Sequence, residues 1–105
     1  MPDPTRGEVW LVDLGMVAKV RPCLVLSVAV ADEDRALFTV VPRTTSVRGS
    51  RFEVALDVKF LRTGAFDAQN LVTIPRPKLM QRLGTLSVDQ FRQVEIAVRN
   101  WLGLA

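Results

Sequence analysis

The sequence contains no histidine, no tyrosine and a single cysteine, Cys23, in 105 residues. Ser-His and Cys-His catalysis and structural zinc sites need residues that are missing, and one cysteine cannot form a disulfide within the chain. No apolar run approaches the roughly 20 residues of a membrane span, and the N-terminus lacks the pattern of a secretory signal. We therefore expect a cytoplasmic protein with no metal, no cofactor and no membrane contact.

The residues that are present support one folded domain over positions 1–105. Hydrophobic residues make up 49% of the chain and charged residues 24%, which is enough apolar material for a core. The net charge is only +3, but eleven of the fourteen cationic side chains are Arg. Because the guanidinium group can bind phosphate through two parallel hydrogen bonds, this excess of Arg over Lys favours a nucleic-acid partner.

Strand-forming patterns cover most of the chain before residue 80. Val, Leu, Phe and Trp dominate the segments between turn residues, which predicts strands. Pro22 lacks an N–H group, so we place it at the start of its strand. Residues 79–86 fit either a strand or a helical turn. The expected strands are Gly7 to Leu14, Cys23 to Val30, Ala36 to Val41, Phe52 to Val58 and, more weakly, Ala65 to Ile74.

The segment from Pro42 to Arg51 differs from its surroundings. It carries three Arg and several hydroxyl groups and has no acidic residue. This composition predicts a segment outside the core that offers many hydrogen-bond donors in one place.

The C-terminal segment has the pattern of an amphipathic helix. Ser87 and Gln90 have the spacing of a capping box, and Gly103 stands where a C-terminal cap belongs. Between them, one apolar stripe recurs at intervals of three and four residues. A chain of five or six strands that ends in one helix is typical of a small antiparallel or barrel-like α+β domain.

Several motifs follow one another in an order that resembles the MazF/PemK family of toxin endoribonucleases. None is specific alone, but together they cover nearly the whole chain. The motifs are Arg6 to Leu14, Arg21 to Ser27, Val41 to Thr45, Gly49 to Val54, Ala68-Gln69, Leu83 to Leu86 and the final Leu102 to Leu104.

The resemblance implies a mainly β fold, a small SH3-like antiparallel barrel with a C-terminal helix of the MazF, CcdB and Kid type. It further implies a homodimer that cleaves single-stranded RNA at a short sequence motif, without metal, and is neutralised by a cognate antitoxin. The family's catalytic Arg falls on Arg21, in the Arg-Pro step before the second strand. Its catalytic Thr falls on Thr44, two residues after the Pro that ends the third strand.

Two departures from the family pattern concern RNA binding. The connection between the first two strands, Gly15 to Val20, is shorter than in most members. The RNA target sequence and the mode of antitoxin binding therefore cannot be transferred from the family to this chain. After Ala68-Gln69 the usual cation is missing, which removes one expected positive charge from the site.

RNA can be cut without metal because its 2′-hydroxyl attacks the adjacent phosphorus and leaves a 2′,3′-cyclic phosphate and a 5′-hydroxyl. Arg21 suits charge neutralisation and hydrogen bonding to the leaving 5′-oxygen, but not the role of base, since it stays protonated. Thr44 can donate to a nonbridging phosphate oxygen. The general base stays open among carboxylates near the motifs, namely Glu8, Asp13 and Asp67.

The remaining candidates are expected to bind the RNA strand. We expect phosphate contacts from four cations, which makes binding salt-dependent. Because the chain has few aromatic residues for base stacking, we expect hydroxyls and backbone amides to recognise the RNA. The predicted RNA-binding residues are Lys19, Arg43, Thr45, Ser46, Arg48, Arg51 and Gln69.

Other interpretations stay open at this level. Arg21 can be a solvated strand start, and the Arg residues from 43 to 51 can belong to a solvated loop. Trp101 fits core or dimer packing better than ligand contact, and Cys23 fits an inert buried thiol. At the level of function, the alternatives are a gyrase-inhibiting toxin of the CcdB type, and a barrel that binds RNA without cleaving it.

Overall fold

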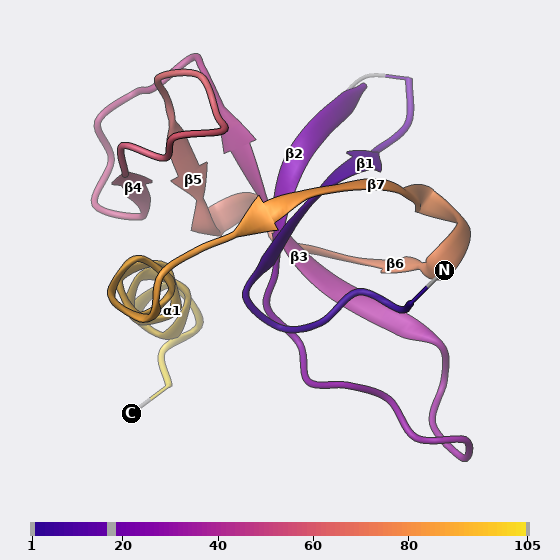
Figure 1. Ribbon diagram of the computed structural model, residues 1–105. Helices are drawn as coiled ribbons and strands as arrows, with labels where there is room; N and C mark the ends of the chain where they lie inside the picture. Colours follow the sequence, from indigo (N-terminus) through magenta and orange to yellow (C-terminus); the bar gives the residue numbers. More distant parts are fainter. Residues whose placement is uncertain (1, 17–18, 105) are drawn as a thin grey trace.

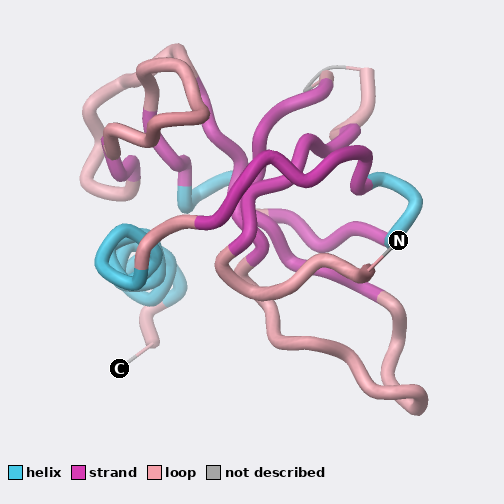
Figure 2. Tube along the Cα trace, in the orientation of Figure 1, coloured by secondary structure: helices cyan, strands magenta, loops and turns pink. Residues whose placement is uncertain are grey.

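The computed structural model describes residues 2–16 and 19–104 and shows a twisted antiparallel sheet with one long helix beside it (Figures 1 and 2). Two short 3-10 helices interrupt the strands. In chain order the elements are β1 (Glu8–Asp13), β2 (Val20–Val25), β3 (Leu37–Thr44), β4 (Glu53–Ala55), β5 (Ala65–Asp67), η1 (Ala68–Asn70), β6 (Val72–Pro75), η2 (Arg76–Lys78), β7 (Leu79–Thr85) and α1 (Val88–Leu102).

The seven strands form one sheet in the order β4-β5-β3-β2-β1-β7, with β6 paired to β3. Every pairing is antiparallel. The expected mainly β fold with a C-terminal helix is therefore confirmed. The sheet does not close into a complete barrel, because within the described chain β4 pairs only with β5 and β7 only with β1.

Strand β2 begins two residues before Pro22, so the prediction that Pro22 opens this strand is wrong. Pro22 pairs with Leu11 of β1, whereas the pairing of β2 with β3 starts only at Cys23. At Pro22 the strand thus has a paired neighbour on one side only, and a missing N–H is tolerated there.

Strand β3 continues to Thr44 and carries Pro42 and Arg43 into the interior. The expectation that the whole segment from residue 42 to 51 stays outside the core is wrong for these two residues. The reason is tertiary: Arg43 pairs with Phe66 of β5, and a strand that is covered on both sides buries its side chains. In addition, β2 ends at Val25 rather than Val30, β4 is shorter than expected, and the weak strand expected from Ala65 to Ile74 is divided by η1. Residues 79–85, for which a strand and a helical turn were both open, form a strand.

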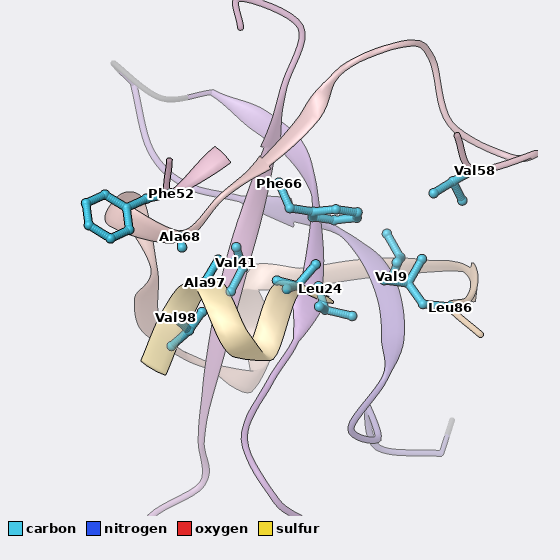
Figure 3. Packing of buried hydrophobic residues seen from close by; sticks show 11 residues of the cluster. Val9, Leu24, Val41, Phe52, Val58, Phe66, Ala68, Leu86, Ala97 and Val98 are labelled. Atoms are coloured by element: carbon cyan, nitrogen blue, oxygen red, sulfur yellow. The ribbon is translucent and has the colours of Figure 1, made fainter. Parts of the chain in front are cut away.

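Apolar side chains fill both faces of the central strands. On one face, Leu24 and Val41 pack with Val98 of α1 in a buried cluster that also includes Phe66 (Figure 3). On the other face, Cys23 belongs to a second buried cluster, together with residues of β1, β3, β6 and β7. Burial on both faces explains why β2 reads as an almost continuous apolar run.

The helix begins and ends as its sequence predicts. Ser87 accepts a hydrogen bond from the Gln90 backbone N–H at 3.1 Å, and the Gln90 side chain accepts from the Ser87 N–H at 3.0 Å. Gly103 adopts a left-handed conformation with φ of 71° and caps the C-terminal end. Among the described residues, no helix is long and apolar enough to cross a membrane.

We expect Ser87→Ala to lower the free energy of unfolding by about 1 kcal/mol, because the helix loses its N-terminal cap. Chemical denaturation of both proteins measures the difference. Thr63→Ala, which removes an exposed hydroxyl outside the helix, is the control. Equal stability of the Ser87→Ala variant and the wild-type protein would contradict the role of this cap.

Candidate active site

Arg21 and Thr44 lie at the ends of two neighbouring strands. The register of β2 and β3 pairs Cys23 with Pro42 and Leu24 with Val41. Arg21 and Thr44 lie two residues beyond the last of these pairs, Arg21 near the start of β2 and Thr44 at the end of β3. Both residues line a hollow of about 300 Å³, the first hollow, whose lining residues are Leu14, Arg21, Pro42, Arg43, Thr44, Asp67 and Asn70.

The Thr44 hydroxyl is oriented by its own turn. Its Oγ1 accepts a hydrogen bond from the Ser46 backbone N–H at 3.0 Å. Among the described residues no acceptor takes the Thr44 hydroxyl proton, so this proton can be donated to a ligand in the first hollow.

Asp67 is the carboxylate of the first hollow. It ends β5 and caps η1, where its Oδ1 accepts from the Gln69 N–H at 3.2 Å and its Oδ2 accepts from the Asn70 side-chain amide at 2.5 Å. Glu8 and Asp13, the other carboxylates near the motifs, lie elsewhere. Glu8 binds Arg82 at 2.8 Å and Asp13 accepts the Gly15 N–H at 2.9 Å.

A second hollow of about 300 Å³ adjoins the first and shares Thr44, Asp67 and Asn70 with it. Its wall is almost entirely polar and includes three of the predicted RNA-binding residues. The residues that complete this second hollow are Ser46, Arg48, Ser50, Glu53 and Gln69.

Glu53 shapes the second hollow by holding the loop before β4. Its carboxylate accepts the backbone N–H groups of Arg48 at 3.0 Å and Ser50 at 3.0 Å. These backbone hydrogen bonds, with that of Ser50 first, lower the pKa of Glu53 below its ordinary value. The loop that carries Arg48 is therefore fixed by an ionised carboxylate.

A third hollow of about 480 Å³ lies beside Arg21 and is more apolar. Arg21, Arg43 and Thr45 line it together with Phe60 and Arg62 of the connection between β4 and β5. Arg21 and Arg43 thus stand between the first and third hollows.

Three predicted RNA-binding residues are placed differently from the rest. Arg43 is only 4% exposed and lines the first and third hollows from inside the protein, so its predicted phosphate contact stays a prediction. The Arg51 guanidinium lies 4.5 Å from the Phe52 ring and faces a groove beside α1. Lys19 is exposed in the connection between β1 and β2, part of which, Val17 and Ala18, lies outside the described residues.

Sequence reasoning missed Asn70 and Glu53 as parts of the site. A signal for Asn70 exists in the run Asp67 to Asn70, since Asp and Asn side chains often cap short turns two or three residues away. Glu53 has a local signal as well, because its carboxylate accepts backbone N–H groups only three and five residues earlier, at Ser50 and Arg48.

Cys23 stays out of the chemistry of the site. Its side chain is fully buried, and this burial raises the pKa of the thiol to about 12. Cys23 is thus the inert buried thiol that the sequence suggests. Among residues 2–16 and 19–104, no cluster of three or more Cys, Asp or Glu side chains could hold a metal ion.

Comparison with known proteins gives a match over almost the entire chain. The family model of the PemK-like, MazF-like toxins of type II toxin-antitoxin systems covers residues 5–102. The chain belongs to this family. The probable endoribonuclease MazF5 of Mycobacterium tuberculosis is 34% identical over 104 residues, which cover 90% of this chain and 93% of that protein.

Solved structures of toxins share the fold of this PemK/MazF-like chain. A mycobacterial endoribonuclease in complex with its cognate antitoxin matches with a TM-score of 0.83 and 28% identity, over 97% of both chains. The Mycobacterium tuberculosis toxin MazF-mt6 matches with a TM-score of 0.79 and 31% identity, over 93% of this chain and 98% of that one.

We expect Glu53→Gln to destabilise this toxin chain at neutral pH and to have little effect in acid. A lowered folded-state pKa adds stability above the unfolded-state pKa, and this stability is lost as the pH falls through the folded-state value. Melting temperatures of both proteins from neutral to acidic pH test this. The exposed Glu33→Gln is the control, and a difference between Glu53→Gln and wild type that stays constant with pH would refute the role of Glu53.

Proposed function

We propose that this chain is an endoribonuclease toxin that cleaves single-stranded RNA, and that the first hollow is its active site. The observation that carries the proposal is the meeting of Arg21, Thr44 and Asp67 in one hollow at the ends of β2, β3 and β5. Membership of the PemK/MazF-like toxin family supports it, as do the relatives named endoribonucleases. The gyrase-directed alternative needs neither Arg21 nor Thr44.

Asp67 is the general base of the proposed reaction. Its carboxylate takes the proton of the RNA 2′-hydroxyl while the 2′-oxygen forms a bond to phosphorus. The bond from phosphorus to the 5′-oxygen then breaks, and the 5′-oxygen takes a proton from water. The products are a 2′,3′-cyclic phosphate and a 5′-hydroxyl. The hydrogen bonds from Gln69 and Asn70 fix the orientation of the carboxylate.

Arg21 and Thr44 stabilise the charge that develops in this step. The Arg21 guanidinium neutralises the phosphate oxygens and donates a hydrogen bond to the leaving 5′-oxygen. The Thr44 hydroxyl donates to a nonbridging oxygen, as its free proton allows. The second hollow, with Ser46, Arg48 and Gln69, contacts the nucleotide next to the cleaved bond.

The decisive experiment incubates the purified protein with a long single-stranded RNA of defined sequence in excess EDTA and maps the new ends. We expect wild-type cleavage, a loss of about 100-fold to 1,000-fold in Thr44→Ala from one missing donor, and a similar or larger loss in Arg21→Ala. We expect a loss of about 100-fold or more in Asp67→Asn from the missing base.

Matched controls for this experiment change the same residue types away from the hollows, at exposed positions. They are Arg35→Ala, Thr73→Ala and Asp32→Asn, for which we expect wild-type rates. No cleavage by the wild-type protein would overturn the nuclease function. Cleavage that survives the Arg21, Thr44 and Asp67 substitutions would overturn the assignment of the site, and loss of activity on chelation would contradict the metal-independent reaction.

A cognate antitoxin and a second copy of the chain are the protein partners we propose. The antitoxin is supported by the family description and by the mycobacterial relative solved with its own antitoxin. The dimer is supported by family membership and by exposed apolar residues on α1, including Ile96 and Leu102. Light scattering at micromolar protein is expected to give the mass of a dimer, and a monomeric mass would contradict this.

A further inference from the structure

Arg43 is a buried cation that belongs to neither the proposed reaction nor the apolar core. Its side chain is 4% exposed. Its Nη2 donates to the backbone carbonyl oxygens of Leu56 at 2.8 Å and Arg62 at 3.0 Å, and the guanidinium lies 5.0 Å from the Phe66 ring centre. Arg43 therefore ties the segment from residue 56 to 62 to strand β3.

The positive charge of Arg43 is only partly compensated. Three ion pairs occur among the described residues, and Arg43 takes part in none of them. Its Nε and Nη1 atoms are buried and have no hydrogen-bond partner among residues 2–16 and 19–104. Burial lowers the pKa of Arg43, and the Asp57 carboxylate acts in the opposite direction. A buried charge with unsatisfied donors is costly, so packing alone does not explain it.

The location of Arg43 indicates a function for its positive charge. Arg43 lines the first and third hollows, and Arg21 is the other residue common to both. In the part of the chain that the structure describes, Asp67 is the sole carboxylate that lines the first hollow, and no carboxylate lines the third. An anion beside Arg21 would therefore lie in the field of a second cation that water screens weakly.

We propose that Arg43 is a positioning residue of the RNA site that acts from inside the protein. Its charge strengthens the binding of the phosphate held by Arg21, and its two carbonyl contacts hold the segment that carries Phe60 and Arg62 against the site. This inference rests on the proposed nuclease function. It assigns to Arg43 a role that differs from that of the exposed cations, which contact the RNA strand directly.

The test compares Arg43→Lys with Arg43→Gln. Lys keeps the charge but cannot bridge both carbonyl oxygens as the guanidinium does, whereas Gln keeps donors and loses the charge. The probe is a short RNA across the mapped cleavage site, with a 2′-deoxy nucleotide at the cleaved position so that it binds without reacting. At about pH 6.5, where a buried amine keeps its proton more readily, we expect Arg43→Lys to bind about tenfold more tightly than Arg43→Gln.

Melting temperatures separate this effect from a purely structural one. Both variants lose the double carbonyl contact, and only Lys keeps a buried charge that costs stability, so we expect Arg43→Lys to melt no higher than Arg43→Gln while it binds RNA more tightly. Equal affinities of the two variants, alongside normal wild-type cleavage, would overturn the role of Arg43 and leave the nuclease function intact. Absence of wild-type cleavage would overturn the nuclease function and, with it, this inference.

Asp57→Asn tests the same claim without touching Arg43, and so remains informative if both Arg43 variants fail to fold. Asp57 is exposed, and its negative charge acts on Arg43. Without this negative charge, the positive electrostatic potential around Arg43 is stronger. We therefore expect RNA affinity to rise about twofold to threefold at physiological salt. Asp32→Asn makes the same change in net charge in the β2–β3 connection, far from β4 and β5 (Figure 1). Equal affinities of these two Asp variants would contradict the proposal.

Discussion

The antiparallel register of β2 and β3 is the constraint on which the site depends. The last pair joins Cys23 to Pro42, and Arg21 and Thr44 lie two residues beyond it, where both line the first hollow. Apolar packing on both faces of these strands fixes this register, since a shift by one residue would exchange the two faces. The core therefore sets the geometry of the polar site at its edge.

A second pairing completes the arrangement. At its end β3 leaves β2 and pairs with β5, and this brings Asp67 to the hollow that contains Arg21 and Thr44. The same pairing covers Arg43 and converts a residue of a basic segment into a buried cation. One tertiary contact thus supplies both the proposed base and the internal charge of the site.

Local chemistry determined which features could be predicted from the sequence. The capping of α1 by Ser87 and Gly103, the inert Cys23 and the order of the motifs all depend on near neighbours or on burial. The end of β3, the burial of Arg43 and the placement of Asp67 beside Arg21 and Thr44 depend on pairing between distant segments, which no local pattern contains. Pro22 shows the same limit, because its place inside β2 depends on where β3 begins to pair.

In the proposed reaction the RNA supplies the nucleophile through its own 2′-hydroxyl, which allows a chain without histidine to cleave it. The most direct measurement compares cleavage of an RNA with cleavage of the same RNA carrying a single 2′-deoxy nucleotide at the mapped position. We expect the 2′-deoxy substitution to abolish cleavage there, and the all-ribose RNA to give a 2′,3′-cyclic phosphate end. Cleavage of the substituted RNA at the same bond would contradict it.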